Sequence, residues 1–298
     1  MSTSLVRAAA LAAALAGVAP AACAGAESAQ AHTPAEGAQA DARPERGTQS
    51  SLAARVNAAP DGEVWMHFAS RPGVCGGGDD DNVNISSGSR QHRSGVYISD
   101  HQVTTGDGNW NCVEGPVWVA LVRSGGRIEH VRVRVARPWR TEGRGRVTDL
   151  GTVGAREASE YLLSLAERAT DGEVGEKALL PATLADSVTT WPALLRIAKR
   201  EAAPQKTRRS AVFWLSQQAG DAITRQLGDF VNDDNEDREL RKHAVFALSQ
   251  RPREEAVPEL VRIARTHRDP EIRKTARFWL GQSNDPRAVA LFEEILSH

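Results

Sequence analysis

The sequence lacks a dominant charge, because 37 Lys and Arg residues balance 38 Asp and Glu residues and leave a formal net charge of −1. General nucleic-acid binders are usually clearly basic, so the composition argues against that class. The sequence also contains no G-x-S-x-G, H-E-x-x-H or C-x-x-C motif and no glycine-rich phosphate loop before a helix. It therefore indicates no catalytic residue and no cofactor.

Cysteine is scarce, with three residues in the chain, and the N-terminus determines how they are interpreted. Arg7 precedes the apolar run "AAALAAALAGVA", and the small residues of "ACAGA" follow. This pattern is typical of a secretory signal peptide, predicted over residues 1–24, and it is too short for a membrane anchor. The alternatives are a helix of the folded protein, or lipidation at Cys23, although Pro20 stands where a lipobox usually has a Leu-like residue.

Export to the periplasm or the exterior would leave Cys75 and Cys112 in an oxidising compartment. Two cysteines there most simply form a disulfide, and two free thiols are the alternative. The two residues lie 37 positions apart. A bridge closing such a loop contributes about 3–4 kcal/mol by restricting the unfolded chain.

The chain divides into regions of different pattern. Residues 25–50 contain almost no large apolar side chain, which predicts a disordered leader. Residues 51–150 include runs in which apolar residues alternate, as at Val64, Met66 and Phe68, and this period of two predicts half-buried strands. "RSGGRI" between two such runs predicts a hairpin. We therefore expect a small antiparallel β module whose long loops carry the two cysteines.

Residues 151–298 change to a helical period and contain repeats. "RRSAVFWLSQ", "LRKHAVFALSQ" and "IRKTARFWLGQ" place Ala211, Ala244 and Ala276 33 and 32 residues apart. A second apolar pattern, which includes "ALLRIAKR" and "ELVRIART", interleaves with the first at the same period. Two helices per repeat predict an α-solenoid of about four and a half repeats. The expected fold class is α+β multidomain: a disulfide-stapled antiparallel β module followed by this solenoid.

The segment "DPEIRKTARFWLGQ", with "AVPELVRIA" before it, resembles HEAT repeats, in particular the short repeats also seen in phycobilisome lyases. The resemblance covers residues 154–298 and implies a solenoid that binds a partner. It does not carry over an activity: HEAT-like hydroxylases bind iron through His-Glu pairs, which this sequence lacks, and nothing marks a chromophore site. The layout is similar to that of exported bacterial proteins.

Basic residues recur in front of the repeated alanines. On a helical projection Arg208, Arg241 and Arg273 lie near the core edge, where we expect them to pair with acidic groups of their own or a neighbouring repeat. The residues that follow them, Arg209, Lys242 and Lys274, lie on a free stripe that continues to Ser216, Ser249 and Gly281. The stripe is either a solvated face or a binding surface for an acidic partner.

One stretch resembles a metal site. "CGGGDDDNVN" offers Asp79, Asp81 and their neighbours as oxygen ligands suited to calcium, but it lacks the Gly and the distal Glu of an EF-hand, so a solvated acidic loop is the simpler interpretation.

The predicted function is a non-catalytic exported scaffold that binds a protein or peptide along the solenoid. The alternative is an envelope enzyme with its site in the loops of the β module.

Overall fold

The computed structural model describes residues 50–76, 83–87, 94–99, 102–107, 113–141 and 145–297. Within these limits, residues from 50 onward belong to one compact unit that runs to the C-terminus. The predicted signal peptide, nearly all of the predicted leader, Cys112 and the acidic residues Asp79 and Asp81 lie outside the described residues. Cys75 lies inside them, in a strand.

A four-stranded sheet has the order β8-β7-β1-β9. Its strands are β1 (Gly62–Phe68), β7 (Val117–Ser124), β8 (Arg127–Val135) and β9 (Val147–Thr152). The hairpin between β7 and β8 turns at Gly125 and Gly126, where φ is 55° and 76°, which confirms the hairpin that the sequence predicted. The expectation of a purely antiparallel module is wrong for β9, which pairs with β1 in parallel. The sequence predicted no strand at Val147–Thr152, because apolar and polar residues do not alternate in this segment.

A second sheet has five strands in the order β5-β4-β3-β2-β6, and all its neighbours are antiparallel. Its strands are β2 (Val74–Gly76), β3 (Val83–Ser87), β4 (Ser94–Ser99), β5 (Gln102–Asp107) and β6 (Val113–Glu114). The sequence led us to expect Cys75 in a long loop. It lies instead in β2, where its side chain is buried and its backbone pairs with Glu114.

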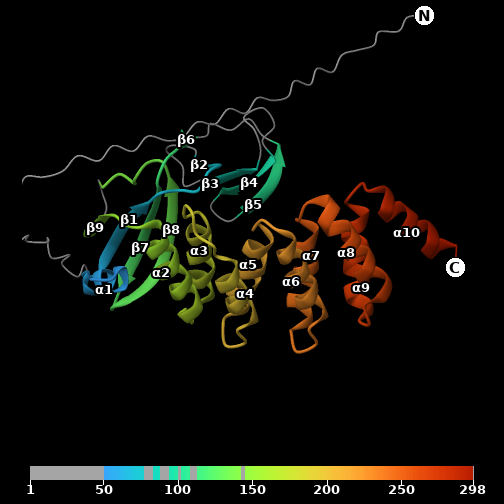
Figure 1. The fold of residues 1–298 in the computed structure, drawn as a ribbon. Coiled ribbons are helices and arrows are strands. Elements are labelled where there is room, and N and C mark those ends of the chain that lie inside the picture. The colour runs from blue at the N-terminus through green and yellow to red at the C-terminus, as the bar shows by residue number, and fades with distance from the viewer. Residues whose placement is uncertain are drawn as a thin grey trace, which may run out of the picture. The chain divides into compact units, whose positions relative to one another are not determined.

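Nine helices follow β9 among the described residues, as α2 (Ala155–Arg168), α3 (Gly172–Thr183), α4 (Trp191–Lys199), α5 (Gln205–Ser216), α6 (Asp221–Asn232), α7 (Arg238–Ser249), α8 (Arg253–Thr266), α9 (Pro270–Gly281) and α10 (Pro286–Leu296). Consecutive helices pair, from α2 with α3 to α8 with α9 (Figure 1). The second helices α3, α5, α7 and α9, here called the inner helices, contact one another in succession. The interleaved period of the sequence is thereby confirmed: this part of the chain is a stack of helical repeats.

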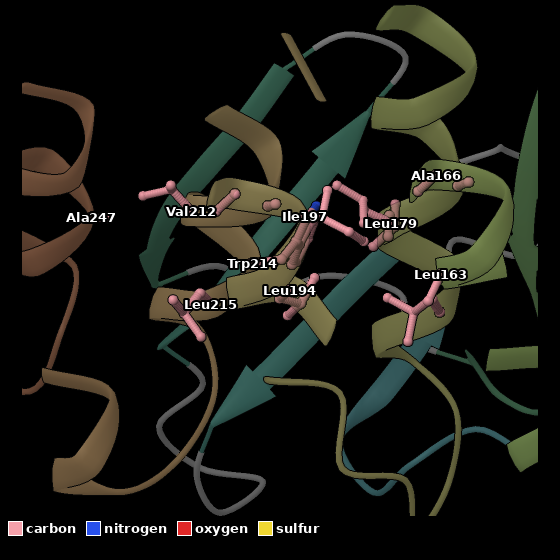
Figure 2. Close-up of a cluster of buried hydrophobic side chains, with 14 of the residues drawn as sticks. Leu163, Ala166, Leu179, Leu194, Ile197, Val212, Trp214, Leu215 and Ala247 are labelled. Atoms are coloured by element: carbon pink, nitrogen blue, oxygen red, sulfur yellow. The ribbon is translucent and has the colours of Figure 1, made fainter. Parts of the chain in front are cut away.

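The repeated sequence forms the core of the stack. Ala211, Ala244 and Ala276 have no exposed surface, and each lies on an inner helix that packs against its neighbours. Large side chains fill the space around them. Figure 2 shows Ile197 of α4 and Trp214 of α5 in this core. Trp214 is only 4% exposed, so it is a packing residue of this core.

The helices begin at caps that the sequence displays. Asp237 accepts a hydrogen bond from the Leu240 amide at 3.1 Å, and Asp269 accepts one from the Glu271 amide at 2.9 Å. Such caps satisfy amides that have no partner inside the helix. Together with burial of the alanine faces, they explain why each repeat forms where the pattern predicts.

The first sheet and the helical stack share one core. Val64, Met66 and Phe68 point from β1 into the hydrophobic cluster that also contains the buried residues of the helices. Beyond β1 the chain pairs with the loop after α3, since Ser70 forms a β-bridge with Ala185. Helix α1 (Leu52–Ala58) adds two buried apolar side chains to the same cluster. Within the described part of the chain, no helix has the length and hydropathy that a membrane span needs.

Candidate partner-binding surface

The basic stripe occupies equivalent positions on three neighbouring inner helices. Arg209 of α5 and Lys274 of α9 are exposed. Lys242 of α7 is partly exposed, and its Nζ lies 3.1 Å from Glu239 of the same helix. Each of the three stands two residues before a buried alanine of the repeat. The structure thus places all three on the surface, and their role in binding stays a prediction.

The stripe does not continue as the helical projection suggested. Ser216 is buried, only 2% exposed, and its hydroxyl donates to the carbonyl of Phe213 at 2.7 Å. Ser249 repeats this bond to Phe246 at 2.6 Å and is partly exposed. These serines lie in the last turn of their helices, where a hydroxyl satisfies a carbonyl three residues earlier. They are structural residues rather than part of a free surface.

Phenylalanines, which the sequence analysis did not single out as a site, complete the surface. Phe213, Phe246 and Phe278 each stand four residues after a member of the basic stripe, so the cation and the ring share one face of each inner helix. The rings of Phe213 and Phe246 have centroids 6.5 Å apart and planes 12° apart. Phe278 is 58% exposed. We call these three residues the aromatic row.

Two further rings adjoin the aromatic row. The Trp279 centroid lies 5.0 Å from that of Phe246, and the His243 centroid lies 5.5 Å from it. Burial lowers the pKa of His243, and the positive charge of Arg209 lowers it further. The formal positive charges of this surface are those of Arg209, Lys242 and Lys274.

Two arginines at the core edge of the inner helices, Arg208 and Arg241, pair with acidic groups, as predicted. Arg208 donates from Nε to the carbonyl of Ala198 at 2.7 Å and forms a buried ion pair with Glu236. Arg241 lies 3.8 Å from Asp269, which caps the inner helix of the next repeat. These pairs join one repeat to the next.

The same expectation is wrong for Arg273 of α9. Among the described residues its partners are carbonyl groups, with Nη1 donating to His267 at 2.6 Å and to Arg268 at 3.0 Å. Arg241 pairs with Asp269, the carboxylate that caps the next inner helix, α9. Arg273 lies on α9 itself, and the helix that follows it, α10, corresponds to the first helix of a pair and not to an inner helix. Arg273 therefore bonds backward to the loop that precedes its own helix.

Arg251 joins adjacent repeats through backbone atoms. It stands between α7 and α8 with a side chain only 4% exposed. Its guanidinium donates to the carbonyls of Ser216 at 2.9 Å and Gly220 at 3.0 Å, and to the carboxylate of Glu255 at 2.7 Å. It thereby fixes the loop between α5 and α6. No sequence pattern marks this role, because most of the acceptors are backbone carbonyls, which any residue supplies.

The sequence predictions of a metal site, an enzyme site and a disulfide concern residues that the structure describes only in part. No group of three or more His, Cys, Asp or Glu side chains that could hold a metal ion occurs among the residues the structure describes. The calcium candidates Asp79 and Asp81 are outside that set, as are many loop residues of the alternative enzyme site. The pairing of Cys75 with Cys112 stays a prediction for the same reason.

The stack of paired helices defines an α-helical repeat protein. A family model of HEAT repeats matches residues 224–298, from within α6 to the C-terminus. The helical region is accordingly HEAT-like, in agreement with the resemblance seen in the sequence. No curated protein matches the chain. HEAT repeats commonly mediate protein interactions, so both the fold and the surface direct attention to the inner helices.

Proposed function

We propose that this protein is a non-catalytic scaffold that binds an acidic peptide segment of a partner protein across α5, α7 and α9. One observation carries the proposal: a cation and a phenylalanine, four residues apart, recur on three adjacent inner helices. Packed helices lie about 8–10 Å apart, so the surface repeats its chemistry at that interval. A matching segment would present carboxylates and apolar side chains at similar spacing.

The cations and the phenylalanines of this surface have separate physical roles. The cations attract an acidic segment over a distance of about 10 Å at 0.1 M salt and discriminate against basic segments. The aromatic row provides apolar area that loses water on contact, and aromatic side chains are enriched among residues that dominate binding energy. The exposed Phe278 offers the largest gain, because its neighbours in the row are already partly covered.

The test is selection of peptides from a random library on the immobilised full-length chain. The expected peptides combine Asp or Glu with spaced apolar residues, and their affinity falls as salt rises from 0.1 to 1 M, where the Debye length shrinks to about 3 Å. Combined Arg209→Glu, Lys242→Glu and Lys274→Glu substitutions should abolish capture and leave the helical circular dichroism intact. Phe278→Ala should weaken binding without removing its salt dependence.

A matched control reverses three charges on the first helices of the repeats. Arg196, Arg225 and Arg265 are exposed on α4, α6 and α8, so replacing them with Glu changes the net charge equally. This control should bind like the parent. Equal binding by both triple variants would refute the proposal, and so would enrichment of basic peptides.

We also propose that the chain is exported and that Cys75 and Cys112 form a disulfide. Supporting the pairing, β6 begins one residue after Cys112 and is hydrogen-bonded to the strand that contains Cys75. Mass spectrometry of the protein recovered from the producing cells should give an N-terminus near residue 25 and a linked peptide pair under non-reducing digestion. A lipid on Cys23 would support the alternative anchor. A retained residue 1 with two alkylatable thiols would contradict both parts.

The resemblance to phycobilisome-lyase repeats is one of architecture, and we propose no lyase activity from it.

A further inference from the structure

Helix α10 exposes apolar side chains at positions that the repeat buries elsewhere. Five large apolar side chains are exposed in the described part of the chain, and three of them lie on α10. Val289 is 54% exposed and Leu296 is 85% exposed. The residues 32 positions earlier, Val257 and Ala264 of α8, are fully buried. The same side of the helix is therefore covered in α8 and open in α10.

The difference between the two helices lies in what covers them. The inner helix α9 packs on α8, whereas α10 lies beside α8 and α9, and the described residues include no further inner helix to cover it (Figure 1). The half-buried Phe292 stands three residues after Val289 and four before Leu296, so the three share one side of α10. We call these three residues the end row. Contiguous exposed apolar side chains are typical of protein–protein contact sites.

A charged residue on α9 narrows the chemistry of the covering surface. The position after the repeated alanine is Val212 in α5 and Val245 in α7, both fully buried on helices that pack against the next inner helix. In α9 this position is Arg277, which is half-buried and donates from Nη2 to the carbonyl of Ala264 at 3.3 Å. No carboxylate of the described residues pairs with it. Since a covered guanidinium needs a matching charge, the covering surface has to combine apolar side chains with a carboxylate.

The end row itself has such a carboxylate at its side. Glu293 follows Phe292 and stands four residues after Val289, and it is exposed. The end of the stack therefore presents an apolar row with a carboxylate on α10 and a guanidinium on α9. A surface with all three parts is complementary to itself, and two copies related by a two-fold axis present it to each other.

We propose that two copies of this chain associate through α10 as a two-fold dimer. The end row of one copy packs against the end row of the other, and Glu293 of each copy meets Arg277 of the second copy. The opposite end of the stack offers no counterpart for a head-to-tail contact, because its helices share a core with the four-stranded sheet. Outside α9 and α10, the described residues expose one large apolar side chain, Val113 of β6.

The size of the end surface sets the expected strength. Two helices of 11 and 12 residues side by side form an area about 17 Å long and about 20 Å wide. This area falls short of the roughly 800 Å² that each partner buries in a standard interface. We therefore expect a weak dimer with a Kd on the order of 10 μM.

Sedimentation equilibrium of the full-length chain, from about 1 to about 200 μM, tests the proposal without any added ligand. Combined Val289→Ser and Leu296→Ser substitutions should raise the Kd of the dimer at least about ten-fold, because both apolar side chains lose water on association. Both side chains are exposed in the single chain, so circular dichroism and the melting temperature should not change. Val113→Ser is the matched control and should dimerise like the parent.

A charge exchange tests the two-fold pairing itself. Glu293→Arg places two like charges together in each contact and should raise the Kd about ten-fold or more. Adding Arg277→Glu rebuilds the pair with its signs exchanged and should restore the parent Kd. Arg209→Glu on α5 should leave the Kd unchanged, which separates this contact from the proposed peptide surface. A monomer at the highest concentration, equal weakening by Val113→Ser and the double serine variant, or no restoration by the charge exchange would each overturn the proposal.

Discussion

The two parts of the molecule use arginine in opposite ways. In the helical stack the side chain of Arg251 is 4% exposed and its guanidinium is surrounded by acceptors from the preceding loop and from α8. On the outward face of the four-stranded sheet the side chain of Arg132 is 33% exposed and pairs with Glu63, and its Nε has no acceptor among the described residues. Arg241 is intermediate, because it has two carboxylates near its terminal nitrogens and an Nε that the described part of the chain leaves unmatched.

The difference between these arginines lies in how many of their donors have an acceptor, and this decides how much each contributes to stability. A guanidinium has five donors in a fixed plane, and burying it is tolerable only when they are matched. The matched arginines of the stack hold one repeat on the next. The arginine of the sheet pairs with Glu63 through a terminal nitrogen and keeps a shielded Nε without an acceptor among the described residues. Arginines that look alike in the sequence thus differ in how completely the fold matches their donors.

The largest effect should follow from Arg251→Ala. Removing this side chain leaves the carbonyls of Ser216 and Gly220 and the carboxylate of Glu255 without their donor. Breaking a buried, hydrogen-bonded charge costs about 3–5 kcal/mol. We expect urea unfolding to show a loss of that size in the free energy of unfolding.

Two controls define the other side of the comparison. Arg196→Ala removes an exposed arginine whose Nε lies 2.9 Å from Glu167 and should cost no more than about 1 kcal/mol. Arg132→Gln should have an effect of similar size, because Glu63 keeps its bond from Trp65. If Arg132→Gln destabilised the chain as much as Arg251→Ala, the sheet arginine would be a joint of the fold and the comparison would fail.

Sequence reasoning recovered the helical stack because its determinant is local and repeated. Ala211, Ala244 and Ala276 recur at a fixed interval, and packing requires a small residue at each. The parallel strand β9 was missed altogether, because its sequence, VTDLGT, does not alternate apolar and polar residues. Arg251 was missed because its acceptors are mostly backbone atoms, which any residue supplies.

The surfaces were only partly accessible to the same reasoning. The basic stripe follows from the repeat, whereas the partial exposure of Phe213 and Phe246 and the exposure of Phe278 are known only from the structure. The alternation that placed Val64 and Met66 inside also placed Trp65 and His67 outside. What the sequence could not supply is that Nε of Arg132 has no acceptor among the described residues, which depends on distances between strands.

The smallest predicted effect concerns an arginine of the matched kind at the end of the stack. Arg287 donates to Asp285 from Nε and Nη2, both at 2.8 Å, and from its amide at 2.9 Å. The guanidinium bond and then the amide bond lower the pKa of Asp285 to about 2 from its usual 3.8. A lowered carboxyl pKa contributes stability above the unfolded pKa, and this contribution is lost as pH falls from about 4 to about 2.

Asp285→Asn isolates this contribution, because Asn keeps an acceptor for the start of α10 and removes the charge. The difference in free energy of unfolding between the parent and the variant should be constant from pH 7 to pH 5 and should shrink as pH falls below 4. Urea unfolding at pH 5, 4, 3 and 2 measures it, and subtracting the variant cancels the titration of other carboxyl groups. A difference that stays constant down to pH 2 would show that Arg287 does not hold this carboxylate in the folded chain. It would then belong with Arg132, as an arginine near a carboxylate that adds little to the stability of the fold.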